Sequence, residues 1–290
     1  MAVIFKHPEL ADYIGTVGAV RLESPQAELP SLTRQFETGQ LTFLRKLRLQ
    51  IDHDFWGGLP VDRFPALAEL RSTPAQSGGG RDELLDASLA AARLPRRLAR
   101  RLKSEMQAIY AQILPVHAAL FAGYRPRRPQ ISWRLAEVRG EPLHLEVPAD
   151  PETQRATLLV NLDNQPCIWM SGPRLEDLAE RYGPSLPPPL LRAAPAPAVL
   201  AALGKAAFGD APVAWSEDQP KHVIYFDPGD VWIQDLRLAA HQTFYGRRLL
   251  RLDFDVDPAS MRKRSRHYLV MADALRARML KFLPGPSPAS

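Results

Sequence analysis

The sequence lacks most of the features that mark an exported or membrane-embedded protein. Its 290 residues include one cysteine, Cys167, so no disulfide can form within the chain and a reducing compartment is the simplest setting. No apolar run approaches the roughly 18 residues of a membrane-spanning helix. The first residues show no secretory signal pattern. These absences predict a soluble, cytoplasmic protein.

The composition is that of a globular protein, with 46% hydrophobic and 24% charged residues. The 28 prolines concentrate at 184–197, which predicts a surface loop. The net charge is +5, and much of the positive charge falls on 93–103, where leucines recur every four residues in a predicted amphipathic helix. Such a helix can lie on an anionic membrane, bind an acidic substrate or pack its leucines on the core. Its candidate substrate-binding residues are Arg96, Arg97, Arg100 and Arg101. The chain shows no nucleic-acid motif.

The pattern of elements predicts an α+β fold. Residues 82–122 have helical spacing, with Pro115 expected to kink or divide the helix. Short strands with turn signals then follow, at 130–139, 142–147, 155–163, 166–172, 222–235 and 249–256. Such strands are typical of a sandwich or barrel, and we predict a double-stranded β-helix (jelly roll). The predicted regions are a mainly helical 1–129, a jelly-roll core at 130–258 with a proline-rich insertion at about 184–212, and a C-terminal helix and tail at 259–290.

The segment PLHLEV at 142–147 places a histidine and a carboxylate two residues apart. In a strand, His144 and Glu146 share one face, while Leu143, Leu145 and Val147 share the other. A buried charge is costly unless it is paired or binds a cation. The segment therefore predicts either a structural His–Glu pair or two metal ligands.

A second histidine, His241, lies far downstream, after the turn Asp227-Pro228-Gly229-Asp230. Two histidines and one carboxylate form the facial triad of non-haem Fe(II) oxygenases, which leaves coordination positions open for co-substrate and O₂. We predict that His144, Glu146 and His241 bind iron. The alternative for His241 is an ordinary loop histidine. Of the other histidines, His117 is predicted to be a packed helix residue and His222 to be exposed.

A 2-oxoglutarate-dependent oxygenase also needs a cation for the far carboxylate of its co-substrate. Arginine suits this role because its planar fork matches a carboxylate. Arg248 is in phase with Leu250 and Leu252, which we take as the inward face of the last strand, so Arg248 is the first candidate and Arg251 the second. Asn161 is a turn residue that can also hydrogen-bond the co-substrate.

With these residues identified, the chain resembles the Fe(II)/2-oxoglutarate-dependent oxygenases. The strings SWRLAEVRGEPLHLEV and KHVIYFDPGDVWIQDLRLAAHQTFYGRRLLRLDF are similar to the Kdo 3-hydroxylase family of Gram-negative bacteria, most strongly over 130–256. The resemblance implies hydroxylation of the sugar acid Kdo to Ko on Kdo-lipid A, with Fe(II), 2-oxoglutarate and O₂. It also implies action at the inner face of the inner membrane, with possible peripheral contact to anionic lipid. The wider superfamily of Fe(II)/2-oxoglutarate-dependent oxygenases more often has Asp where this chain has Glu146.

Two other functions fit the same residues. The chain can be an Fe(II)/2-oxoglutarate hydroxylase of another substrate, or a non-catalytic jelly-roll protein that binds sugar and uses its histidines structurally. Iron dependence and succinate release separate the enzymes from the binding protein, and a substrate panel that includes lipid-linked Kdo separates the two enzymes.

Overall fold

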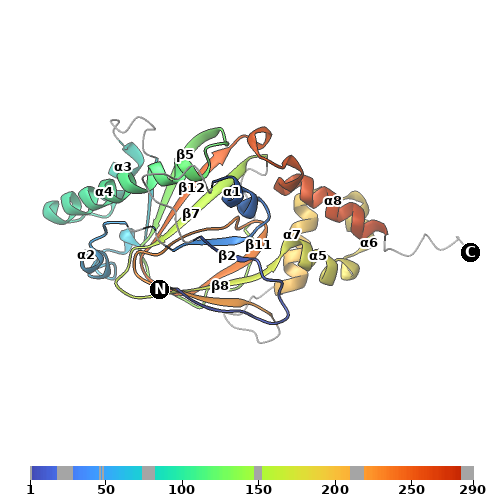
Figure 1. Ribbon diagram of the computed structural model, residues 1–290. Coiled ribbons are helices and arrows are strands. Elements are labelled where there is room, and N and C mark those ends of the chain that lie inside the picture. The colour runs from blue at the N-terminus through green and yellow to red at the C-terminus, as the bar shows by residue number, and fades with distance from the viewer. Residues whose placement is uncertain are drawn as a thin grey trace, which may run out of the picture.

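The computed structural model of the protein contains two β-sheets that face each other, with helices on an outer side and at one end (Figure 1). It describes residues 2–17, 29–45, 47, 49–73, 82–146, 152–209 and 219–281. The mixed helix-and-sheet class is confirmed. The structure thus has two sheets with an interior between them, while the jelly roll stays a prediction.

Each sheet combines strands from distant parts of the chain. The seven-stranded sheet has the order β2-β3-β10-β7-β12-β5-β4, with bounds Ile14–Val17, Leu41–Leu44, Val231–Ile233, Gln154–Asn161, Leu249–Val256, Pro126–Arg134 and Glu69–Ser72. The five-stranded sheet has the order β1-β9-β8-β11-β6, with bounds Val3–Phe5, His222–Phe226, Cys167–Arg174, Ala239–Gly246 and Val138–Arg139. Because most neighbours in the sheets are not neighbours in sequence, residues far apart in the chain meet between the sheets.

The helices form two groups (Figure 1). The first group comprises α1 (Leu29–Glu37), α2 (His53–Gly57), α3 (Glu83–Ala91) and α4 (Arg96–Leu120). The second lies at the other end of the sheets and comprises α5 (Leu175–Tyr182), α6 (Pro188–Ala193), α7 (Ala196–Phe208) and α8 (Tyr268–Lys281). Single 3₁₀ turns occur at Pro65–Leu67, Gly183–Ser185, Pro258–Ser260 and Arg264–Arg266. None of the helices in the described parts of the chain combines the length and apolar composition needed to cross a bilayer.

Strand β12 shows why the sheet has this orientation. Its apolar face, Leu250, Leu252 and Phe254, belongs to the core that α4 covers, and the ring of Phe254 stacks on His117 at 4.0 Å. An alternating strand buries its apolar face against whichever layer offers apolar partners. The polar face of β12 therefore points the other way, into the space between the two sheets.

One end of the space between the sheets is filled by aromatic and aliphatic side chains. Trp232 stacks on Phe226 at 4.0 Å and meets Trp169 edge-on at 5.5 Å. Leu159 and Leu249 complete this apolar cluster. Aromatic side chains bury large areas and pack in preferred geometries, so this end of the interior is solid.

The proline-rich stretch 184–197, predicted as a surface loop, instead contains helix α6 and the start of α7. Both helices carry proline in their first turn. Proline is tolerated there because its missing N–H has no partner within the helix. The leucines and alanines that follow pack on α5 and α8, which explains why the stretch is ordered.

The N-terminal region contains both helices and strands. Strand β1 is part of the five-stranded sheet, and β2, β3 and β4 are part of the seven-stranded sheet. For example, β3 pairs with β10, and β4 pairs with β5. Helix α1 ends at Glu37, Gly39 then adopts a positive φ of 72°, and β3 follows. The predicted region boundaries stay predictions, and the tail 282–290 lies outside the described residues.

Three predictions about the histidine-bearing segments differ in outcome. Pro115 does not divide α4, which continues through it to Leu120. His117 is buried, as predicted. His222, predicted to be exposed, is buried, because the N-terminal segment covers it and the His7 amide donates to its Nδ1 at 3.0 Å. The covering segment is more than 200 residues away in sequence, so local sequence did not reveal it.

Candidate functional site

His144 and His241 lie side by side. Their backbones form an isolated antiparallel bridge, with N–H···O distances of 3.1 and 2.9 Å. Their ring centroids are 4.5 Å apart, with 51° between the planes. The predicted strand at 142–147 is reduced to this one bridge, and β11 carries the second histidine. The structure therefore brings together the two histidines that the sequence singled out.

The imidazole of His241 is enclosed by packing. It is 5% exposed, it lies parallel to Trp169 at 5.3 Å, and its buried Nδ1 has no partner among the described residues. Burial, helped by the neighbouring His144, lowers the pKa of His241 to about 3. The ring is therefore neutral near pH 7, which is the form that binds a metal.

His144 is oriented by its own segment. Its Nδ1 lies 2.9 Å from the carbonyl oxygen of Pro142. A proton on Nδ1 makes that hydrogen bond and leaves the lone pair of Nε2 available. This is the arrangement by which proteins commonly fix the tautomer of a metal-binding histidine.

Glu146 is engaged with Arg251. The two terminal nitrogens of Arg251 donate to the two carboxylate oxygens at 2.6 and 2.8 Å. Burial on its own raises the pKa of Glu146, but the hydrogen bonds and charge of Arg251 outweigh it and lower the pKa to about 2. The carboxylate is therefore ionised. It also lies near His241.

Arg251 is in turn held by Asp253. Its Nε donates to Asp253 at 2.8 Å, and Asp253 also accepts from the Thr157 hydroxyl at 2.7 Å on the neighbouring strand. Burial on its own lowers the pKa of Arg251, and the adjacent carboxylates of Asp253 and Glu146 reverse this and raise it. Its fork is thus fixed, with both terminal nitrogens directed at Glu146.

As the side chains stand, no three His, Cys, Asp or Glu residues in the described ranges are grouped closely enough to hold a metal ion. The two histidines fit a metal site because their rings lie next to each other. In addition, the buried Nδ1 of His241 has no hydrogen-bond partner among the described residues, so no hydrogen bond from that atom assigns the ring a structural role. Glu146 fits as the third ligand only after it exchanges Arg251 for the metal. His144, Glu146 and His241 therefore lie near one another, and the carboxylate of Glu146 pairs with Arg251.

Arg248 lies in different surroundings from those expected. Its guanidinium donates to the carbonyl oxygens of Trp56 and Leu59, each at 2.9 Å, and to that of Leu135. The choice of Arg248 assumed that the apolar face of β12 points to the site, but that face packs on α4. Arg251, on the opposite face, is the arginine that meets Glu146.

Asn161 is used within its own turn. Its amide donates to the carbonyl oxygens of Gln165 and Phe226 at 2.9 and 3.1 Å, and its Oδ1 accepts from the Asp163 amide at 3.1 Å. These bonds match the turn role that the sequence also allowed. The described residues show no contact between Asn161 and the histidine pair.

The basic turn of α4 lies beside α2. Arg101 pairs with Asp52 at 2.7 Å and covers the ring of Phe55 at 4.5 Å. The other three candidate arginines, Arg96, Arg97 and Arg100, are exposed. A shallow groove of about 520 Å³ runs between α2 and this turn, lined by Phe55, Leu59, Leu98, Arg97 and Arg101 among others. The described contacts of these arginines involve α2 and not the histidines.

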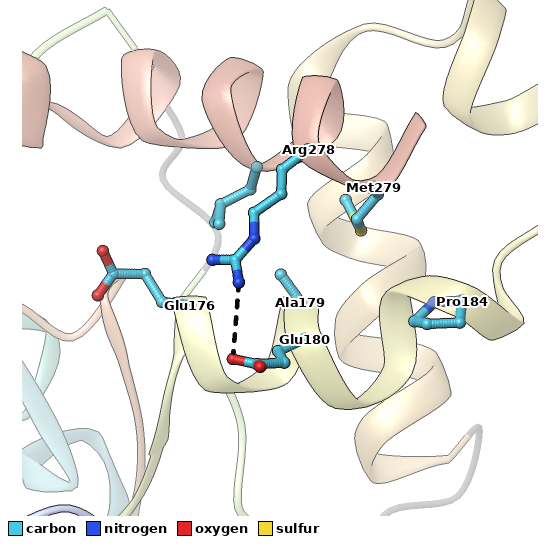
Figure 2. A pocket seen from close by; sticks show the side chains of 7 residues that line it. Glu176, Ala179, Glu180, Pro184, Arg278 and Met279 are labelled. Atoms are coloured by element: carbon cyan, nitrogen blue, oxygen red, sulfur yellow. Dashed lines mark ion pairs between the residues drawn. The ribbon is translucent and has the colours of Figure 1, made fainter. Parts of the chain in front are cut away.

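A more enclosed cavity of about 180 Å³ lies between α5 and α8 (Figure 2). Its walls include Ala179, Leu275 and Met279, and Arg278 reaches across it to Glu180 at 4.0 Å. None of the predicted site residues lines it. The chemistry of the histidine pair is therefore separate from this cavity.

The sequence reasoning missed several residues around the histidines. Trp169, which stacks on His241, and Asp253, which holds Arg251, were not among the predicted site residues. Arg155, on the strand predicted at 155–163, was not among them either. The signal was present: Arg155 and Thr157 alternate with Ala156 and Leu158, as expected of a strand with one polar face.

Known proteins resemble this chain in three-dimensional structure. No protein-family model matches the chain. No curated protein matches it either. Solved structures do match, over nearly the whole chain.

The structural matches include the Kdo hydroxylase KdoO, a non-haem Fe(II) α-ketoglutarate-dependent dioxygenase. Its complex with cobalt(II) aligns with a TM-score of 0.60 at 15% identity, covering 96% of this chain and 99% of that one. Its complexes with succinate and Fe(III) and with α-ketoglutarate and Fe(III) align with TM-scores of 0.55 and 0.52 at 17% and 16% identity. They cover 91% and 90% of this chain, and 95% of each of those chains. The protein described here therefore has the fold of the Kdo hydroxylase KdoO.

Proposed function

We propose that this protein is an Fe(II)- and 2-oxoglutarate-dependent dioxygenase that hydroxylates the Kdo sugar of the lipopolysaccharide inner core, converting Kdo to Ko on Kdo-lipid A. The observation that carries the proposal is the pairing of His144 with His241 beside the ionised Glu146. The support from fold is the match to KdoO over 96% of the chain. On this proposal the two sheets form a jelly roll whose interior holds the site.

In this proposal His144, Glu146 and His241 bind Fe(II). With 2-oxoglutarate and O₂, the bound iron supplies the oxidising power that inserts oxygen into a C–H bond. The protein positions the metal ligands and excludes water from the site. Trp169 lies parallel to His241 and excludes water from one side of it. The neutral imidazole of His241 needs no deprotonation before it binds a metal.

Arg251 is the proposed anchor for the far carboxylate of 2-oxoglutarate. Its fork already makes a bidentate pair with a carboxylate, that of Glu146. When Glu146 turns to the metal, both terminal nitrogens of Arg251 become available to another carboxylate. Asp253 keeps the guanidinium in place during this exchange. Arg248 is a weaker candidate, because backbone carbonyls already occupy its fork.

The basic turn of α4 is the proposed contact with anionic phosphate groups, either of the lipid-linked substrate or of the inner face of the inner membrane. Arg96, Arg97 and Arg100 are exposed and adjoin an apolar groove. Exposed basic residues beside apolar side chains suit an anionic lipid surface. The protein would then be cytoplasmic and bind the membrane peripherally.

Mass spectrometry of the product tests the function directly. Kdo-lipid A incubated with the protein, Fe(II), 2-oxoglutarate and O₂ should gain one oxygen atom, and succinate should form with it. A parallel reaction with the His241→Ala protein is the matched control. Succinate without a heavier Kdo-lipid A indicates an oxygenase of another substrate. Absence of both under iron-replete conditions contradicts the proposed enzyme class.

A further inference from the structure

The polar face of the seven-stranded sheet carries a row of charged residues that leads away from the histidines. Along β12, Arg251 and Asp253 are followed by Asp255, and along β7, Arg155 lies opposite Asp255 in the strand register. This row begins where the apolar cluster around Trp232 ends. The row therefore continues, along the same face of the sheet, from Arg251 beside Glu146 to Asp255 and Arg155.

Three arginines are close enough to Glu146 for their charges to interact: Arg155, Arg237 and Arg251. Arg251 donates to Glu146 and Asp253. Arg237 is almost fully buried, and its three nitrogens donate to Asp235 and to the carbonyl of Thr153 at 2.9 to 3.0 Å. Both guanidinium groups have their hydrogen-bonding capacity largely used within the protein.

Arg155 differs from these two. Its one hydrogen bond to a described side chain runs from Nε to Asp255 at 3.3 Å, and its two terminal nitrogens donate to no described residue. The side chain is nevertheless only 18% exposed. The terminal nitrogens of this largely sheltered side chain are therefore free to bind a carboxylate, whose two oxygens match the fork of a guanidinium.

We infer that Arg155 and Asp255 form a subsite for the substrate, in which the terminal nitrogens of Arg155 bind a sugar carboxylate and Asp255 accepts a hydrogen bond from a sugar hydroxyl. This inference rests on the proposed function and specifies how a sugar acid is recognised. A carboxylate matches the arginine fork, and a hydroxyl-bearing ring beside it matches the exposed carboxylate of Asp255, which is 34% exposed. Arg251, committed to Glu146 or the co-substrate, is not available for this role.

The binding experiment compares two ligands on the Co(II)-loaded protein with 2-oxoglutarate in the absence of O₂. The ligands are the methyl glycoside of Kdo and the methyl ester of the same glycoside, which has no negative charge. Titration calorimetry should show the wild-type protein preferring the acid by about 10- to 100-fold, the worth of one charge-assisted hydrogen-bond pair. In Arg155→Gln the acid should bind no more tightly than the ester.

Three further variants keep the experiment decisive. Arg155→Lys retains the charge but not the fork, so it should keep only part of the preference for the acid. Asp255→Asn should weaken both ligands about equally. Arg139→Gln is the matched control, because Arg139 also pairs with one nearby carboxylate, Glu137, but its side chain is 79% exposed. The control should bind both ligands as the wild type does.

The possible results separate this inference from the function on which it rests. A full preference for the acid in folded Arg155→Gln or Arg155→Lys overturns the subsite and leaves the Kdo proposal standing. If the wild type binds neither glycoside, the Kdo proposal fails and the subsite fails with it. Thermal unfolding of each variant shows whether a loss of binding reflects misfolding. If Arg155→Gln is misfolded, the preference of Arg155→Lys for the acid tests the subsite instead.

Discussion

The two ends of the space between the sheets are built from different chemistry. At one end, Trp232, Phe226 and Trp169 fill the space with stacked rings. At the other, Arg251 and Asp253 line it with charges that pair with one another. Dense packing contributes stability that any apolar side chain of the right shape can supply. Paired charges contribute little net stability, and we propose that the charges at this end serve binding and chemistry instead.

Trp169 belongs to both ends. One neighbour of its ring is Trp232 at 5.5 Å, and another is His241 at 5.3 Å. The apolar end is thus a rigid wall against which the second histidine is positioned. If this comparison is right, mutations at the apolar end should change stability first, and mutations at the polar end should change ligand binding first.

The largest expected effect on stability is at the apolar end. Trp232→Ala removes a fully buried ring and should lower the free energy of unfolding by about 3–5 kcal/mol. Urea denaturation followed by circular dichroism measures the change. Thr157→Val at the polar end is the comparison variant, and a loss from it as large as that from Trp232→Ala would contradict the division between the ends.

The next effect concerns metal binding. His241→Ala should weaken the binding of Co(II) by more than about 100-fold, a loss larger than the usual effect of removing a residue that only supports a ligand. Titration calorimetry on the metal-free protein measures it. His117→Asn, which changes another buried histidine, is the control. Equal affinity of the wild type and His241→Ala would remove His241 from the proposed metal site.

A smaller effect separates the two candidate arginines. Arg251→Gln should weaken the binding of 2-oxoglutarate to the Co(II)-loaded protein by about 10- to 100-fold, because a bidentate charged pair is lost. Arg248→Gln should instead lower the free energy of unfolding, because its carbonyl partners lose their donor. A greater loss of 2-oxoglutarate affinity in Arg248→Gln would restore Arg248 as the anchor.

The smallest expected effect is a pH dependence from His117. Burial lowers the pKa of His117 to about 3, against an ordinary value of 6.5. Between these values the unfolded chain binds a proton that the folded protein does not, so stability falls as the pH falls from 6.5 towards 3. From pH 7 to pH 5 this histidine should cost about 2 kcal/mol.

Urea denaturation of the wild type and of His117→Asn at both pH values measures the contribution of His117. Other buried histidines affect both proteins alike, so the difference between the two pH dependences belongs to His117. Identical pH dependences of the wild type and the variant would mean that His117 takes up its proton in the folded state.

Strand prediction succeeded where alternation or turn chemistry was strong. The strand predicted at 249–256 coincides with β12, and the two strands predicted around Asp227-Pro228-Gly229-Asp230 are β9 and β10. Gly229 has a φ of 80°, the conformation that such a turn requires. Strand β11 was not predicted, although it carries His241, because its residues Ala239 to Gly246 do not alternate clearly.

The site was predictable in its residue types and not in its contacts. His144, Glu146 and His241 were singled out from spacing, and the structure brings the two histidines into contact. Nothing local indicated that Arg251 is the partner of Glu146, since they are 105 residues apart. The partner depends on how β12 faces the loop that carries Glu146.

The sequence by itself determined which residues alternate along β12, where the chain turns at Gly229, and that two histidines and a carboxylate are available for a metal. Only the tertiary structure decided which side of β12 faces the interior. Alternation of apolar and polar residues with a period of two distinguishes the two faces of a strand. It does not show which layer covers the apolar face, because that face can pack equally well on a helix or on another sheet. Here α4 covers the apolar face, so the polar face, with Arg251 in place of Arg248, lines the interior.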